Sequence, residues 1–173
     1  MTARFVDRRD AGQQLAKRLQ RFAGRRDVVV VARSQDGAPV AFEIARAIKA
    51  PLQSFEEERQ AADLHGMTLI LVDDGLASEF EMAAAVATLR VKQPDRIVAA
   101  APVGAADVCA RVRCVADDCI LALAPFPFRS VGDWYADFGQ TTVDDVGELY
   151  WLAHADSRSV SAPAAEQAPV SAL

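Results

Sequence analysis

Four stretches of the sequence are continuously apolar, and this feature constrains the fold more than any other. Each has the length of a strand, and β-branched or small residues fill many of its positions. A strand that is apolar at every position is buried on both faces, which is typical of parallel sheets covered by helices. We expect such strands at "DVVVVA" (27–32), "MTLILV" (67–72), "DRIVAAAPV" (95–103) and "ADDCILALAP" (116–125).

Helical patterns separate these strands. Apolar residues recur at the spacing of one helix face in "DRRDAGQQLAKRLQRFAG", and Gly24 is a suitable stop. "PVAFEIARAIKA" repeats the pattern, with Pro39 in its first turn. We expect a short strand at "PLQSF" and further helices at "EEERQAADLHG", 79–90, "GAADVCARVR" and "VDDVGELYWLAHA". This alternation predicts an α/β fold of three layers, α/β/α, around a largely parallel sheet.

The pattern predicts one domain over residues 1–155, a length sufficient for a sizeable core. The remaining residues, 156–173, are rich in serine, alanine and proline and offer little to bury. We expect them to form a disordered tail.

Charge and composition exclude several classes of protein. The net charge of −5 and the pI of about 5.0 disfavour binding to nucleic acid or to an anionic membrane. No apolar run is long enough to span a bilayer, and "MTARFVDRRD" lacks the apolar core of a signal peptide. We therefore expect a cytoplasmic protein. The three cysteines and two histidines show no spacing typical of metal ligands, so we assign none of them to a metal or to catalysis.

Ligands of open parallel sheets bind beyond the carboxyl ends of the strands. This rule points to the segments 32–37, 73–78 and 101–104, with 125–132 as a rim. The most unusual is "LILVDDGLASEFEM", in which Asp73 and Asp74 end a strand and two glutamates open the next helix. Paired acids at this place also occur in simple turns and in phosphoacceptor receiver domains. The later strands lack the lone Asp and the Lys that a receiver domain requires.

Several segments together resemble the type I phosphoribosyltransferase family. "GMTLILVDDGLASEFEMAAAVATLR" is similar to the phosphoribosyl-binding segment of that family. The remaining matches are to a bacterial branch of it: "FVDRRDAGQQLAKRL", "GAPVAFEIARAIKAPL", "RIVAAAPVGAADVCARV" and "VGDWYADFGQTTVDDVGEL". The resemblance covers most of residues 5–152. It implies a type I phosphoribosyltransferase-like fold and transfer of a 5-phosphoribosyl group from phosphoribosyl pyrophosphate, a glycosyltransferase reaction of nucleotide metabolism.

The resemblance also implies roles for individual residues. Asp73 and Asp74 would accept hydrogen bonds from the ribose hydroxyls, since an ionised carboxylate is a strong acceptor. Mg²⁺ would neutralise the leaving pyrophosphate in an active member, with Asp73 and Asp74 as the only side chains that could help to hold it. The phosphate loop would contain Gly75, Leu76, Ala77, Ser78, Glu79 and Glu81.

This phosphate loop departs from the family pattern. The family has Thr-Gly-x-Thr where this chain has Ser78, Glu79, Phe80 and Glu81. Two glutamates oppose a phosphate dianion, because like charges about 5 Å apart repel by roughly 3 kcal/mol at an effective dielectric near 20. Ser-x-x-Glu is also the pattern of a capping box. We expect Ser78 and Glu81 to cap the helix reciprocally and so to satisfy the amides that hold phosphate elsewhere.

Two further departures weaken the resemblance to an active enzyme. The pyrophosphate loop, Pro-Arg-Gly-Gly in the branch, corresponds here to Ser34, Gln35, Asp36 and Gly37, so a cation is lost and an acid gained. Arg33 could replace the lost cation only if the loop were rearranged. In addition, only "EEERQAADLH" stands where the family inserts a flexible loop and hood that exclude water.

Two functions follow from these observations, and no catalytic residue is assigned. One is a phosphoribosyltransferase with weak or lost activity that binds a ribose phosphate, with Mg²⁺ if it is active. The other is a non-catalytic regulatory or scaffolding subunit, a pseudoenzyme that forms a homodimer or pairs with an intact paralogue. The basic start contains Arg4, Arg8 and Arg9 and is offset by Asp7 and Asp10. We interpret it as salt-bridged helix surface rather than a binding patch. The aromatic set is assigned to packing at the sheet edge rather than to base stacking: Phe126, Phe128, Trp134, Tyr135 and Phe138.

Overall fold

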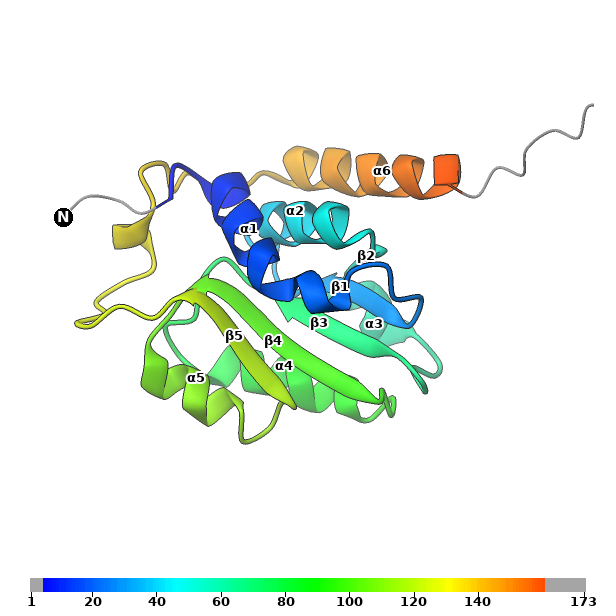
Figure 1. Cartoon of the computed structure of the whole chain (residues 1–173), viewed down its shortest axis with the longest axis horizontal. Helices are drawn as coiled ribbons and strands as arrows, with labels where there is room; N and C mark the ends of the chain where they lie inside the picture. The colour runs from blue at the N-terminus through cyan, green and yellow to red at the C-terminus, as the bar shows by residue number, and fades with distance from the viewer. Residues whose placement is uncertain (1–4, 161–173) are drawn as a thin grey trace, which may run out of the picture.

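The computed structural model describes residues 5–160 and contains one sheet of five parallel strands (Figure 1). The strand order is β2-β1-β3-β4-β5, and every neighbouring pair is parallel. The strands are β1 (Val28–Ala32), β2 (Leu52–Ser54), β3 (Thr68–Val72), β4 (Arg96–Val103) and β5 (Asp118–Leu123). The predicted α/β fold and its parallel sheet are confirmed.

Helices cover both faces of this sheet (Figure 1). One face carries α1 (Arg8–Ala16), its 3₁₀ continuation η1 (Lys17–Phe22), α2 (Ala38–Ile48) and α6 (Val143–Val160). The other carries α3 (Phe55–Gln60), α4 (Phe80–Arg90) and α5 (Ala106–Val112). A short 3₁₀ turn, η2 (Gly132–Trp134), lies between β5 and α6. The architecture therefore has the three layers that the sequence predicts.

The two cores follow directly from the alternation of side chains along each strand. Val28 and Val30 of β1 face the core under α1 and α2, whereas Val29 and Val31 face the core over α4 and α5. The same alternation holds in β3. Because both faces are covered, all five positions of β1 and of β3 are buried. This explains why these strands are apolar throughout.

Two element boundaries differ from the prediction. The polar helix expected over "EEERQAADLHG" ends at Gln60, after a start at which Ser54 and Glu57 form a capping box. The last helix continues to Val160, past the predicted domain boundary at residue 155, so residues 156–160 are helical rather than part of a disordered tail. The rest of that tail, 161–173, lies outside the described residues. Among the described residues, no helix is long and apolar enough to cross a membrane.

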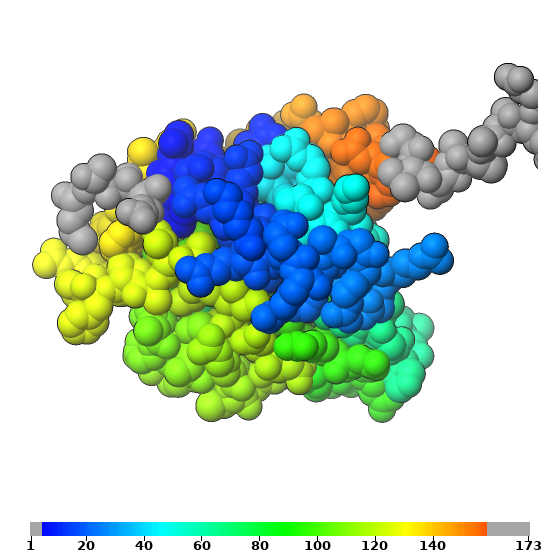
Figure 2. Space-filling view, viewed as in Figure 1, coloured from blue at the N-terminus to red at the C-terminus, as the bar shows by residue number. Residues whose placement is uncertain are grey.

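Helices α1 and α2 lie against each other (Figure 2). They pack closely because Gly12 lies at their contact. A Cβ at residue 12 would lie 2.7 Å from the carbonyl oxygen of Val40 and 2.9 Å from the Cβ of Glu43. Real side chains do not approach so closely, so a larger residue would push the two helices apart. Glycine therefore positions α1, which carries Arg8 at its start, against α2 and the sheet.

We expect Gly12→Ala to lower the free energy of unfolding by up to about 2 kcal/mol, measured by urea denaturation. Overpacking typically costs about 1–3 kcal/mol, against a gain of about 1 kcal/mol for alanine in a helix interior. Gly147→Ala in α6 is the matched control, because no heavy atom lies within 4 Å of its added Cβ. It is expected to stabilise the protein by about 0.5–1 kcal/mol. If both substitutions raise the free energy of unfolding, the contact between α1 and α2 accommodates the added methyl group without a loss of stability, and the prediction is wrong.

Candidate functional site

The carboxyl ends of β1 and β3 bring two predicted loops together. Ala32 and Val72 are register partners, so the residues that follow them leave the sheet side by side. The Ser34 hydroxyl donates to Asp73 Oδ1 over 2.7 Å and accepts from the backbone N–H of Gly37. The predicted ribose acids and the predicted pyrophosphate loop therefore meet at one edge of the sheet, as expected for a parallel sheet.

Asp73 is buried, and both of its oxygens accept hydrogen bonds from the chain itself. Arg33 Nε lies 2.5 Å from Oδ2, and the Nη2 group of Arg33 forms an ion pair with the same oxygen. Oδ1 accepts from Ser34 and, at 3.0 Å, from the backbone N–H of Asp74. Asp73 is only 6% exposed. The charge-assisted bonds from Arg33 and the bonds from Ser34 and Asp74 satisfy both of its carboxylate oxygens within the chain.

Asp74 pairs with a different arginine. Arg8, at the start of α1, places its Nη2 2.9 Å and its Nε 3.0 Å from Asp74 Oδ2. Burial raises the pKa of Asp74 to about 6, the charge of Asp73 adds to this rise, and the Arg8 guanidinium opposes it. Asp36 adds a smaller repulsion. Two adjacent acids therefore carry separate counterions, and the compensation of the second is incomplete.

Arg8 connects this acid to a segment that we call the strap, residues 135–141. Its guanidinium donates to the carbonyl oxygen of Gly139 and lies 4.2 Å from the ring centroid of Phe138. Tyr135 completes the connection, since its hydroxyl donates to the carbonyl oxygen of Asp74 over 2.5 Å. Burial raises the pKa of this hydroxyl, which keeps it a donor. The prediction that Arg8 forms salt bridges is confirmed, but its place on the helix surface is wrong, because the residue is only 8% exposed.

The strap also covers the predicted pyrophosphate loop. Gln35 donates from its side-chain amide to the carbonyl oxygen of Thr141. The backbone N–H of Thr141 donates to Asp36 Oδ1 over 3.2 Å. Loop residues Ser34, Gln35, Asp36 and Gly37 are therefore engaged with the chain itself. Arg8 adds an ion pair to Asp36 at 3.7 Å.

A cavity of about 230 Å³ lies beside the predicted phosphate loop. Its lining includes Arg33, both acids, the loop and Glu81: Arg33, Asp73, Asp74, Gly75, Leu76, Ala77, Ser78, Glu81, Met82 and Val131. Glu79 does not line it, because its carboxylate is 3.0 Å from Arg111 Nε of α5. The structure thus brings together the predicted phosphate-loop residues, with Glu79 turned away.

The predicted capping box at Ser78 and Glu81 is wrong. Helix α4 begins at Phe80 with Glu79 at the N-cap position, and no side chain caps it. Glu81 instead lies 3.1 Å from Arg33 Nη2, a partner from the end of β1. An ion pair between the Glu81 carboxylate and a guanidinium competes well with a hydrogen bond from a backbone N–H to that carboxylate. Arg33, which the sequence places one residue before the degenerate loop, therefore reaches the cavity directly.

The acids as placed do not fit a divalent cation. Mg²⁺ needs oxygen ligands in octahedral geometry, whereas Asp73 and Asp74 already carry the guanidinium groups of Arg33 and Arg8. A cation at the same oxygens would repel both arginines. Within the described residues, no three His, Cys, Asp or Glu side chains are grouped so that they could hold a metal ion.

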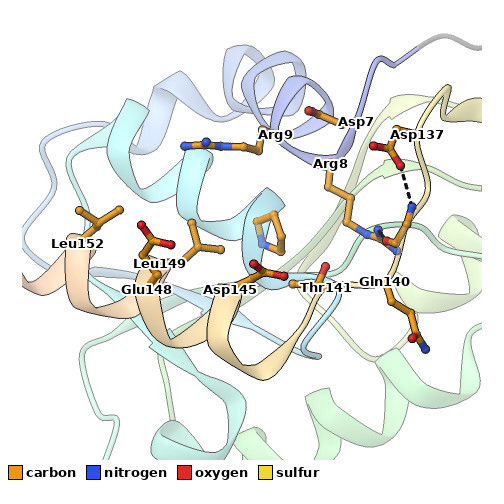
Figure 3. A pocket seen from close by; sticks show the side chains of 12 residues that line it. Asp7, Arg8, Arg9, Asp137, Gln140, Thr141, Asp145, Glu148, Leu149 and Leu152 are labelled. Atoms are coloured by element: carbon orange, nitrogen blue, oxygen red, sulfur yellow. Dashed lines mark hydrogen bonds between the residues drawn. The ribbon is translucent and has the colours of Figure 1, made fainter.

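A second cavity, of about 340 Å³, lies on the other side of Arg8, between α1, the strap and α6 (Figure 3). Arg8 and Arg9 line it from α1, and Asp145 and Glu148 line it from α6 (Figure 3). Asp137 of the strap holds the backbone N–H of Gly139 at 3.0 Å (Figure 3). This cavity separates α6 from the strap at the point where the chain enters that helix.

The aromatic residues mostly pack, as predicted. Tyr135 lies between Phe5, at 5.4 Å between ring centroids, and Phe138, at 4.9 Å. Phe128 and Trp134 pack against the same cluster. Phe126 is the exception, because it is fully exposed and contributes nothing to this packing.

We expect Asp74→Asn to gain stability relative to the wild type as the pH rises. The pKa of Asp74 in the folded protein is about 6, above its ordinary value of 3.8. The stability that protonated Asp74 contributes is therefore fully present below pH about 4 and lost as the pH rises through about 6. The variant has no titrating group at residue 74. The difference in the free energy of unfolding between the variant and the wild type should therefore change by about 3 kcal/mol between pH about 4 and 7.

Urea denaturation of both proteins across this range measures the difference directly, because the titration of all other groups cancels. A difference that does not vary with pH would contradict the incomplete neutralisation of Asp74 by Arg8.

The chain is similar in sequence to known proteins, although no protein-family model matches it. A "Putative phosphoribosyl transferase" of Mycobacterium tuberculosis, from strains H37Rv and CDC 1551, is 28% identical over 211 residues. The match covers 88% of this chain and 47% of the relative, so the chain spans about half the length of the curated relatives it matches.

Solved structures share the fold. The protein TT1426 of Thermus thermophilus superposes with a TM-score of 0.75 at 25% identity, covering 85% of this chain and 97% of that protein. A Neisseria gonorrhoeae protein solved with bound ppGpp shares the fold alone, with a TM-score of 0.54 at 10% identity over 88% of this chain and 98% of its own. The sequence similarity to the mycobacterial relative and the parallel five-stranded sheet covered by helices support one conclusion: the chain has a type I phosphoribosyltransferase-like fold.

Proposed function

We propose that the chain is a phosphoribosyltransferase-like protein in which transfer of a 5-phosphoribosyl group from phosphoribosyl pyrophosphate is weak or lost. One observation carries this proposal: Asp73 and Asp74, the acids expected to bind ribose, are already paired with Arg33 and Arg8. The similarity to the mycobacterial relative supports the class of ligand. The ion pairs support the loss of activity.

The energies favour the internal pairs over a ribose. Removing one partner from a buried ion pair costs about 3–5 kcal/mol, since a charge is left uncompensated. A hydrogen bond from a neutral ribose hydroxyl to a carboxylate returns about 1.5–3 kcal/mol. Displacement of Arg8 from Asp74 by a sugar would therefore cost more free energy than the new hydrogen bond returns. Ribose binding in this arrangement is weak unless the two arginines find new anionic partners.

The pyrophosphate loop, residues 34–37, contains no basic residue, and the nearby Arg8 is already paired with Asp74 and Asp36. The transfer reaction develops negative charge on the leaving pyrophosphate, and Mg²⁺ supplies the compensation in active enzymes. Here Asp36 adds a negative charge, and Thr141 of the strap covers the loop. The residues of the chain can orient a ribose phosphate near Asp73 and Asp74, but they do not stabilise a departing pyrophosphate.

A second function is favoured by the strap itself. Because Gly139 and Thr141 bond to Arg8, Gln35 and Asp36, this segment covers the loop through hydrogen bonds within the chain. That arrangement suits a non-catalytic regulatory or scaffolding subunit. Such a subunit would form a homodimer or pair with an intact paralogue. The acidic charge and the three free cysteines suit a cytoplasmic protein that binds neither nucleic acid nor membrane.

Calorimetric titration with phosphoribosyl pyrophosphate and MgCl₂, joined to an assay of pyrophosphate release, tests the proposal. We expect a Kd in the millimolar range or weaker, which corresponds to a binding free energy no more favourable than about −4 kcal/mol. We also expect pyrophosphate to be released at the background rate. Asp73→Asn/Asp74→Asn is the control, because it removes the acids themselves. Micromolar affinity with release that the control abolishes would overturn the proposed loss of activity.

A further inference from the structure

We infer that Arg33 is the anion-binding group of the cavity beside Gly75–Ser78, and that it accepts a phosphomonoester in exchange for Glu81, without a divalent cation. The inference rests on the proposed function for the identity of the ligand as a ribose phosphate. It adds the residue that receives the phosphate and the residue that competes with it.

The guanidinium of Arg33 has two edges, and only one is fixed. Its side edge, Nε and Nη2, is held by the buried Oδ2 atom of Asp73. The Nη2 atom also lies 3.1 Å from Glu81 Oε2. Within the described part of the chain, Nη1 contacts no acceptor. Arg33 is thus anchored in orientation while a pair of N–H donors stays available in the cavity.

Glu81 is a weak partner of the Arg33 guanidinium. Its side chain is 76% exposed, compared with 9% for Asp73. An exposed ion pair contributes about 0–1 kcal/mol, because water and side-chain entropy offset its attraction. A phosphate can accept two parallel bonds from the Nη1/Nη2 fork, which is the geometry that arginine offers best. Exchange of Glu81 for phosphate is therefore a small step for the protein.

The charges around the cavity identify Glu81 as the excess acid. Asp73 is neutralised by Arg33, whereas Arg8 compensates the charge of Asp74 only in part. Glu81 adds a third carboxylate to two guanidinium groups. When Glu81 turns toward solvent, the cavity no longer repels an anion. The cavity of about 230 Å³ holds several water volumes of about 30 Å³ each, which is room for a phosphoryl group.

This exchange needs no Mg²⁺, because the counter-charge is a guanidinium already fixed to the protein. Glu79, the neighbouring glutamate, takes no part, since Arg111 holds it outside the cavity lining. The two glutamates that both replace family residues are therefore predicted to differ in effect. Only Glu81 opposes the ligand.

A mutant cycle with inorganic phosphate as the probe, in buffer containing EDTA, tests the inference. We expect Glu81→Gln to bind phosphate about 5- to 10-fold tighter than the wild type, since the competing charge is gone. Arg33→Gln should abolish binding, and Arg33→Gln/Glu81→Gln should bind no better than Arg33→Gln. Glu79→Gln, the matched control, should bind like the wild type. Amide chemical shifts or calorimetry report each affinity.

Arg33→Gln leaves Asp73 buried without a counterion, so the cycle is repeated in the background Asp73→Asn, with urea denaturation to confirm folding. An equal gain from Glu81→Gln with and without Arg33 would overturn the inference, because the loop alone would then hold phosphate. A requirement for Mg²⁺ would overturn its metal independence. Inorganic phosphate carries no ribose, so a failed titration overturns this inference and leaves the proposed loss of transfer standing. Pyrophosphate release by the wild type would overturn the proposed loss of transfer and leave this inference standing.

Discussion

Two adjacent carboxylates at the end of a buried strand are the constraint on which this structure depends. Asp73 and Asp74 cannot both be charged in a low-dielectric setting unless each has a counterion. The chain supplies Arg33 from the end of β1 and Arg8 from the start of α1. Because Arg8 also bonds to Gly139 and stacks on Phe138, neutralising one acid fixes the positions of α1 and the strap. The close packing of α1 on α2 at Gly12 holds this arginine in place.

The same neutralisation explains why the site is occupied by its own chain. Each group that would meet a sugar phosphate has found an internal partner: the acids have arginines, and the loop at Gln35 and Asp36 has Thr141. A ligand must therefore exchange partners rather than fill unsatisfied positions. Exchange is costly where the partner is buried, as at Asp73, and cheap where it is exposed, as at Glu81. This difference in burial separates the part of the site where exchange is costly from the part where exchange is cheap.

The fold was predictable because its signals are local. The continuous apolar runs of β1 and β3 and the helical stripe of α6, with Val146, Leu149 and Tyr150, place each element against the core. The site was predictable only in outline. Arg8 pairs with Asp74 across 66 residues of sequence and Arg33 with Asp73 across 40, so no neighbouring pattern marks either pair. The supposed capping box failed for the same reason, since a distant arginine attracted Glu81 away from the helix start.

Packing rather than a ligand determines the shape of the cavity beside Gly75–Ser78. A Cβ on Gly75 would clash with the side chain of Val131, so the loop and the rim are held against each other by close contact alone. The bridge between Leu76 and Gly104 ties the loop to the end of β4 in the same way. Such contacts preserve the pocket when its charges change. The pocket therefore indicates ancestry, whereas the ion pairs of Asp73, Asp74 and Glu81 determine what the present protein can bind.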